Sequence, residues 1–152
     1  MTTDGYDPAG SPPVALTPDA INEMVRQSFP GAGNECAEIG TNVAVAKRVV
    51  SPAEIRPGGY VSGPAQFAIA DAALWYLVFA VLGRVEPMAL TSELSIRFLR
   101  PAVGDVLWAR ATLDSAARRT IVGTVHIWVD DRPHKPTSVG QGTYALPRPP
   151  AT

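Results

Sequence analysis

The chain has 152 residues, of which 46% are hydrophobic and 18% charged, so it is long enough to form one domain around its own core. Its formal net charge of −1 and the lack of a basic block argue against nucleic acid as a partner. The single cysteine, Cys36, fits a reducing cytoplasm, and with His126 and His134 it shows no metal-ligand spacing, so no metal or cofactor site is predicted.

Residues 1–16 are predicted to form a disordered tail, because glycine and proline interrupt any periodicity. The tail lacks the basic start and apolar run of a signal peptide, which also favours a cytoplasmic location. A short helix follows, with Thr17 as N-cap and Pro18 at its first position. Its apolar stripe comprises Ile21, Met24, Val25 and Phe29. Pro30-Gly31 ends this helix, and one strand is predicted from Ala37 to Val50.

A long helix is predicted from about Pro64 to Leu82. Ser62 or Gly63 caps its start, and Pro64 stands where a missing N–H costs nothing. Gly83 ends the helix.

Asp71 is the only charged residue of this helix, which is apolar on every side between Ala65 and Leu82. A lone carboxylate in such surroundings is costly unless it is paired, protonated or functional, so Asp71 is the first candidate for chemistry. A membrane-spanning helix needs ~20 apolar residues and disfavours a central carboxylate. With Gln66 and Asp71 inside the run, the helix is predicted to be buried in a soluble domain, and no membrane partner is expected.

After the long helix the hydrophobic pattern changes to a period of two, which predicts strands. The expected strands are 88–98, 107–113, 121–129 and 137–146. The connections between them are short, so each strand is predicted to pair with its neighbour in sequence and form an antiparallel meander. The apolar face of these strands must be covered, and the long helix is the one long apolar element available. The prediction is an α+β fold with one antiparallel sheet wrapped around one helix, a single domain over 17–147 and a tail over 148–152.

Ser62-Gly63-Pro64, followed by Phe67-Ala-Ile-Ala-Asp71-Ala-Ala, resembles the His-Gly-Gly…Ala-Asp-Thr-Ala signature of the phenylacetic-acid-degradation (PaaI-like) branch of hotdog-fold acyl-CoA thioesterases. The segments Leu94–Ala102 and Gly142–Tyr144 resemble later strands of that family, and the similarity covers roughly residues 37–147. The resemblance implies the hotdog fold, hydrolysis of an acyl-CoA thioester, and assembly into a homodimer or homotetramer.

By the same resemblance, Asp71 is the catalytic carboxylate, as general base or nucleophile, and the N–H of Gly63 polarises the thioester carbonyl. The chain departs from the family in having Ser62 in place of the usual His and Pro64 in place of the second Gly. This departure leaves a second function open, a non-catalytic protein that binds acyl-CoA or another small ligand. A hydratase is disfavoured, because the family's hydratases pair a carboxylate with a histidine, and His126 and His134 fall on a late strand and a turn.

Thioester hydrolysis requires a base or nucleophile and a donor for the developing oxyanion. A helix N-terminus offers unpaired N–H groups, which here belong to Gly63, Ala65 and Gln66 since Pro64 has none. Asp71 follows Gly63 by eight residues, or ~12 Å along a helix, which is far for one carbonyl group. The family solves this with a dimer, in which the helix N-terminus of one subunit faces the carboxylate of the other.

The remaining candidates would bind substrate. Ser62 is typical of an ordinary N-cap and is also a candidate substrate contact, as is Gln66. Trp75, with Tyr76 and Phe79, is more typical of a core, although it could also line an acyl pocket. Arginine suits phosphate binding, and the cationic candidates for the phosphates of coenzyme A are Arg97, Arg100, Arg118 and Arg119, of which Arg100 and Arg118 are selected.

Overall fold

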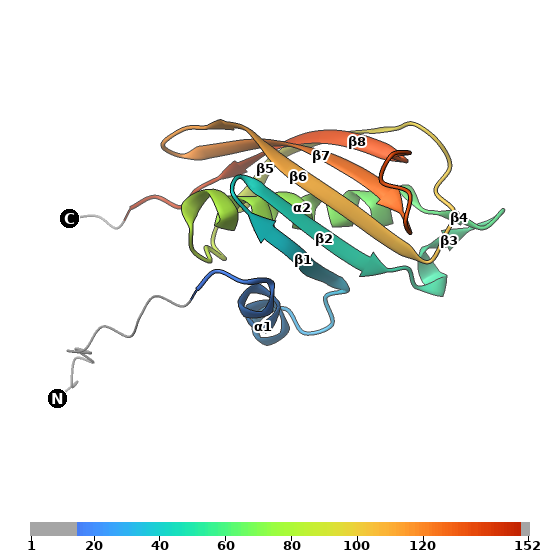
Figure 1. The fold of residues 1–152 in the computed structure, drawn as a ribbon, viewed down its shortest axis with the longest axis horizontal. Coiled ribbons are helices and arrows are strands. Elements are labelled where there is room, and N and C mark those ends of the chain that lie inside the picture. The colour runs from blue at the N-terminus through green and yellow to red at the C-terminus, as the bar shows by residue number, and fades with distance from the viewer. Residues whose placement is uncertain (1–14, 150–152) are drawn as a thin grey trace.

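A computed structural model describes residues 15–149, and most of the two predicted tails lies outside this range. One antiparallel sheet of six strands curves around the long helix α2, and its strand order is β1-β2-β6-β7-β8-β5 (Figure 1). The helices are α1 (Pro18–Ser28) and α2 (Gly63–Leu82), with a short 3-10 helix at Pro52–Glu54. The strands of the sheet are β1 (Asn34–Gly40), β2 (Val43–Val49), β5 (Leu90–Phe98), β6 (Val106–Ala116), β7 (Thr120–Val129) and β8 (Ser138–Ala145). The predicted α+β architecture is confirmed.

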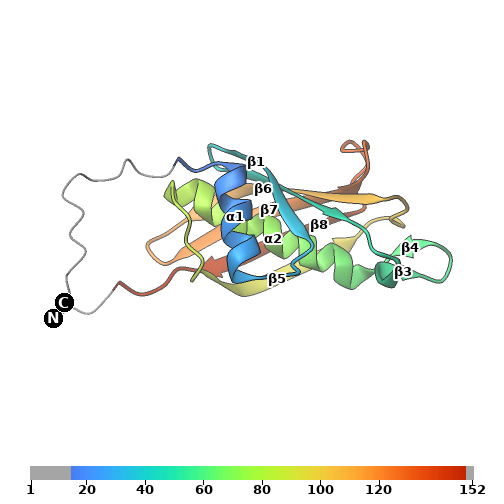
Figure 2. The ribbon, with the colours of Figure 1, turned by 90° about the horizontal axis from the view of Figure 1, so that it is seen from below.

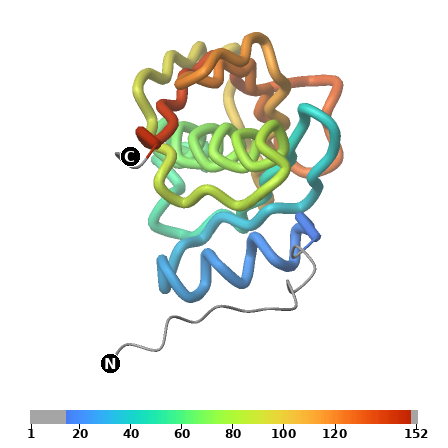
Figure 3. Tube along the Cα trace, turned by 90° about the vertical axis from the view of Figure 1, so that its left-hand side faces the viewer, coloured from blue at the N-terminus to red at the C-terminus, as the bar shows by residue number. Residues whose placement is uncertain are grey.

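Helix α1 lies at the β1 edge of the sheet (Figures 1 and 3). The hydroxyl of Thr17 accepts a hydrogen bond from the N–H of Ala20 at 3.1 Å, which confirms the predicted cap. The Asn22 side chain donates to the carbonyl of Cys36 at 2.9 Å and accepts from its N–H at 2.8 Å, so it fastens α1 to β1.

The prediction of one strand over 37–50 is wrong, because two strands, β1 and β2, form a hairpin there. The chain reverses at Thr41-Asn42, where Asn42 has a φ of +56°. Asparagine tolerates this left-handed conformation, and it follows Gly40, so the turn signal was present inside the predicted strand.

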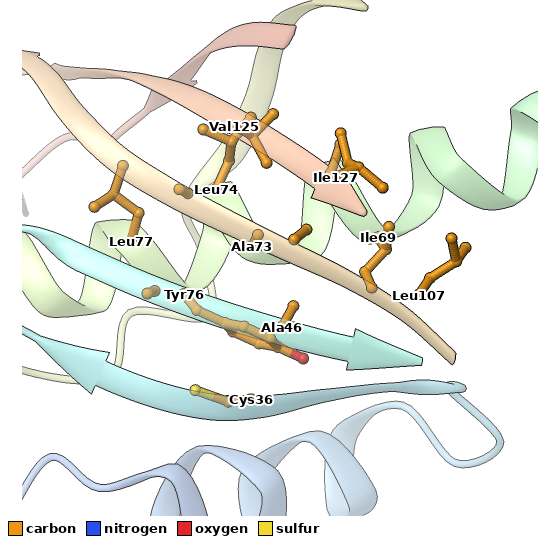
Figure 4. Packing of buried hydrophobic residues seen from close by; sticks show 14 of the residues in the cluster. Cys36, Ala46, Ile69, Ala73, Leu74, Tyr76, Leu77, Leu107, Val125 and Ile127 are labelled. Atoms are coloured by element: carbon orange, nitrogen blue, oxygen red, sulfur yellow. The ribbon is translucent and has the colours of Figure 1, made fainter. Parts of the chain in front are cut away.

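Helix α2 begins and ends as predicted. The hydroxyl of Ser62 accepts from the N–H of Ala65 at 3.3 Å, and Gly83 takes the left-handed conformation with a φ of +71°. The helix is long and apolar enough to cross a membrane, but half of its residues are buried inside the domain, so it is the core helix. Figure 4 shows Leu74 and Leu77 of α2 on the side that faces Val125 of β7.

The strand after α2 is placed differently from the prediction. β5 pairs with β8, and β6 pairs with β2, so β5 and β6 are not neighbours. The connection 99–105 passes the ends of two strands: the N–H of Leu99 donates to the carbonyl of Thr137 at 2.8 Å, and the N–H of Val106 donates to Asp130 Oδ1 at 3.0 Å. Three strand spacings measure ~14 Å, and a seven-residue extended segment reaches ~23 Å, so a short connection is sufficient. The predicted meander therefore holds only for β6, β7 and β8.

Two further strands, β3 (Ile55–Arg56) and β4 (Tyr60–Val61), form a small hairpin before α2. Gly58 and Gly59 both have positive φ values, +93° and +81°, which side chains other than glycine rarely adopt. The pair of glycines thus makes a defined turn at the entrance to the helix.

Candidate active site

Asp71 lies on α2 where the helix faces β5 and β8, and it is half-buried. Its Oδ1 accepts two hydrogen bonds, from the hydroxyl of Thr91 at 2.7 Å and from the hydroxyl of Tyr144 at 2.6 Å. Burial and the bond to Asp71 raise the pKa of Tyr144, so its hydroxyl remains a donor at any ordinary pH. The carboxylate is thereby held in one orientation.

A β-bulge in β5 brings Thr91 to this position. The pairing with β8 shifts between Thr91 and Glu93, so that Thr91 lies opposite Tyr144 and Glu93 opposite Thr143. If side chains alternated strictly along β5, Thr91 would point outward, away from the helix. The bulge reverses this, so that the side chain of Thr91 points toward Asp71. For this reason Thr91 could not be identified from the sequence pattern. Tyr144 belongs to the segment Gly142–Tyr144 that carries the family resemblance, but nothing in the pattern placed its hydroxyl beside Asp71.

Asp71 opens into a cavity of about 290 Å³ between α1, α2 and the segment before β5. The cavity is mainly apolar, and its lining includes Val25, Phe29, Ala68, Ala72, Trp75, Pro87 and Ala89. Trp75 is half-buried and lines the cavity, whereas Phe79 is completely buried and does not. The predicted candidate Trp75 is therefore brought next to Asp71.

Gly63 lines a different cavity, of about 580 Å³, together with Arg56, Gln66 and Arg100. Three N–H groups were candidates at this end of α2. That of Ala65 donates to the Ser62 hydroxyl, and that of Gln66 donates to the Ser62 carbonyl at 3.2 Å. Within the described residues no hydrogen bond uses the N–H of Gly63, which as the first residue of the helix has no partner inside it. Gly63 thus offers the available donor, and a single chain does not place it in the Asp71 cavity.

Gln66 is 3% exposed and is occupied by internal partners. Its Oε1 accepts from the hydroxyls of Thr137 at 3.0 Å and Ser138 at 2.9 Å, and its Nε2 lies 3.5 Å from the carbonyl of Val61. These bonds join the start of α2 to the β7–β8 connection. Ser62 caps the helix, and its role in substrate binding, like that of Gln66, stays a prediction.

The two selected arginines lie far apart. Arg100 shares the cavity of Gly63, at the start of α2. Arg118 lines another cavity beside Leu82, at the far end of a 20-residue helix that spans ~30 Å. The structure therefore does not bring them together on one phosphate group. Among the described residues, no three His, Cys, Asp or Glu side chains form a group that could hold a metal ion.

The segment that contains Gly63 and Asp71 matches a known family. A sequence model of the thioesterase superfamily matches residues 58–134, which are 77 of the 152 residues. The chain belongs to the thioesterase superfamily. The predicted recognition and the prediction of a thioester hydrolase are confirmed at the level of this family.

Solved structures of other proteins share this fold. A candidate thioesterase from Silicibacter sp. TM1040 is 28% identical, with a TM-score of 0.75 over 88% of this chain and 93% of that one. A thioesterase from Haemophilus influenzae is 21% identical, with a TM-score of 0.74 over 86% and 90% of the two chains. The E. coli PaaI protein of the phenylacetic acid degradation operon is 21% identical, with a TM-score of 0.67 over 86% and 88%. None of the curated proteins compared with the chain matches it.

Proposed function

We propose that the chain is an acyl-CoA thioesterase that hydrolyses its substrate to the free acid and coenzyme A. The observation that carries this proposal is the carboxylate of Asp71. This residue lies in the segment that matches the family, and its carboxylate opens into a mainly apolar cavity. Thr91 and Tyr144 both bind Oδ1, and within the described residues no hydrogen bond reaches Oδ2. Oδ2 is thus the oxygen available to a substrate or a water molecule.

In the general-base form of the mechanism, Oδ2 of Asp71 takes a proton from water as the water oxygen attacks the thioester carbonyl carbon. The oxyanion that develops accepts a hydrogen bond from the N–H of Gly63. The C–S bond then breaks, and the thiolate of coenzyme A takes the proton from Asp71. In the nucleophilic form, Oδ2 attacks the carbonyl carbon itself, coenzyme A leaves as the thiolate, and water hydrolyses the resulting anhydride.

A complete site requires two chains in this proposal, because Gly63 and Asp71 of one chain line different cavities. Phe67 lies midway between them along α2 and is 41% exposed. If two copies of α2 packed antiparallel about Phe67, Gly63 of each chain would lie opposite Asp71 of the other. The spacing of four residues on either side of Phe67 supports a shared site.

Strand β5 offers the surface for this pairing. It is an edge strand of the sheet, and its exposed apolar residues include Leu90, which is 68% exposed, and Phe98, which is 53% exposed. An open, apolar edge is a template for another strand. Thr91 contacts Asp71, and Phe98 lies beside Gly63, so antiparallel pairing of β5 with its copy about the middle of the strand gives the same shared site. We therefore propose a homodimer, which could pair further into a homotetramer.

The proposed function is tested by offering a panel of acyl-CoA substrates to the purified protein and detecting the free thiol. Release of thiol from at least one acyl class supports hydrolysis. The replacement of the family's His by Ser62 supports a second candidate, a non-catalytic protein that binds acyl-CoA. Binding of acyl-CoA by calorimetry without release of thiol from any substrate would establish that second function instead.

Tyr144→Phe is expected to lower kcat about tenfold and leave KM nearly unchanged. A hydrogen bond to a charged group contributes about 1.5–3 kcal/mol, and Thr91 still holds the same oxygen in this variant. Steady-state kinetics separates the two constants. Thr124→Val, which removes a hydroxyl bound to Asp114 outside the cavity, is the matched control. A rise in KM with unchanged kcat would show that Tyr144 does not position the carboxylate.

Arg100→Ala is expected to raise KM about tenfold with little change in kcat. In the proposed dimer, the coenzyme A arm leaves the thioester on the Gly63 side, and Arg100 lines that cavity. Loss of a charge-assisted contact to a phosphate weakens the binding of the substrate and of the transition state equally, so KM rises and kcat stays nearly unchanged. Arg118→Ala tests the other selected arginine in the same assay. If only Arg118→Ala raised KM, the phosphates would bind at the opposite end of α2.

A further inference from the structure

The cavity at Asp71 is polar at one end and apolar at the other. Asp71, Thr91 and Tyr144 form the polar end and bind one another. Asn34 also belongs to the lining, and its amide oxygen accepts a hydrogen bond from Arg48 at 3.0 Å. Apart from Tyr76, the rest of the wall is made of apolar side chains, so we expect the cavity to favour an apolar group beyond the reacting carbonyl.

Helix α1 borders the apolar end of the cavity, where Phe29 is 50% exposed. Figure 2 shows α1 running across α2, and Val25 and Phe29 of the α1 segment line the cavity opposite Ala72 and Trp75 of α2. The rings of Phe29 and Trp75 meet edge to face, with centroids 5.7 Å apart and planes at 87°. Such aromatic contacts are favourable and directional. The two side chains therefore form one continuous wall.

This wall is held in place on both sides. The N–H of Phe29 donates to the carbonyl of Val25 at 2.8 Å, and the carbonyl of Phe29 accepts from Ala32 at 3.1 Å. Trp75 also packs against Phe79, which is fully buried, at a centroid distance of 5.0 Å. The wall is thus part of the folded domain.

We propose that Phe29 and Trp75 set the size of the acyl group, which rests on the proposed acyl-CoA thioesterase function. The volume of about 290 Å³ lies just below the ~300–1,000 Å³ that is usual for small-molecule sites. We expect it to suit a short aliphatic chain or a single ring better than a long fatty chain. The family match covers residues 58–134 and does not reach α1, so the end wall lies outside the part of the chain that defines the family.

The test compares kcat/KM for butyryl-, hexanoyl-, octanoyl-, decanoyl- and phenylacetyl-CoA in the wild type and in Phe29→Ala. The wild type is expected to prefer hexanoyl- and phenylacetyl-CoA to decanoyl-CoA. Phe29→Ala removes the side chain at the end of the cavity, so the additional methylene groups of the decanoyl chain gain apolar space. The ratio of kcat/KM for decanoyl-CoA to that for hexanoyl-CoA should therefore rise about tenfold or more.

Met24→Ala is the matched control, because Met24 belongs to the same helix and packs on the core without lining the cavity. It should leave the ratio within about twofold of the wild type, and thermal unfolding checks that both variants are folded. A wild type that hydrolyses decanoyl- and hexanoyl-CoA equally well, or a folded Phe29→Ala with an unchanged ratio, would overturn the inference while leaving the thioesterase function standing.

If the wild type hydrolysed no substrate, the non-hydrolysable thioethers S-hexyl- and S-decyl-CoA would test the inference by calorimetry. The inference would be supported without catalysis if the wild type bound S-hexyl-CoA more tightly than S-decyl-CoA and if Phe29→Ala bound S-decyl-CoA more tightly than the wild type does. Equal affinities for both thioethers in both proteins would overturn it.

Discussion

Asp71→Asn is expected to lower kcat for thioester hydrolysis at least ~100-fold, which is the usual contribution of a positioned base. The substitution is nearly isosteric, and the amide oxygen can still accept the hydrogen bonds that Thr91 and Tyr144 donate to Oδ1. The fold should therefore be kept while the proton acceptor or nucleophile is lost. Thiol release in a steady-state assay measures the effect, with circular dichroism and thermal unfolding as the check on folding.

Asp114→Asn provides a matched control for this experiment. Asp114 also accepts two side-chain hydrogen bonds, from Thr124 and from Gln141, but it does not line the Asp71 cavity. Its substitution should leave kcat within about twofold of the wild type. Wild-type turnover in a folded Asp71→Asn protein would remove Asp71 from the mechanism.

The fold could be predicted from the sequence where local chemistry determines structure. Thr17 and Ser62 cap helices with their own hydroxyls, and Gly83 ends α2 with a positive φ, so the helix limits followed from residue type. The strand order could not be predicted, because the partner of β5 is β8, whose paired residues follow 40 to 55 positions later in the chain. Pairing of this kind depends on long-range packing, and a period-two pattern carries no information about it.

The same distinction between local chemistry and long-range packing applies to the residues of the candidate site. Asp71 could be identified because it is the only charge in an apolar helix, and Gly63 because it begins that helix. Thr91 could not, since the β-bulge that aims it at Asp71 is a feature of strand pairing. Phe29 belonged to a predicted apolar stripe. Its contact with Trp75 could not be predicted, because the two residues are 46 positions apart in the sequence.

The proposal of a shared site leads to a second large effect, which appears only when two inactive variants are mixed. Gly63→Val should be nearly inactive, because the added side chain crowds the space in front of the donor. Even a Cβ atom at this position would lie 3.2 Å from the ring of Phe98. Asp71→Asn should be nearly inactive for the chemical reason given above. Light scattering at micromolar concentration establishes whether each variant forms a dimer.

After subunit exchange, random pairing of equal amounts makes about half of the dimers mixed. A mixed dimer has one site in which both groups are intact, formed by Gly63 of the Asp71→Asn chain and Asp71 of the Gly63→Val chain. Its other site carries both defects, so the mixture should recover about a quarter of the wild-type activity. If each chain held a complete site, every site would keep one defect and mixing would restore nothing. A monomer by light scattering, or no recovery after native mass spectrometry has shown exchange, would therefore contradict a site built from two chains.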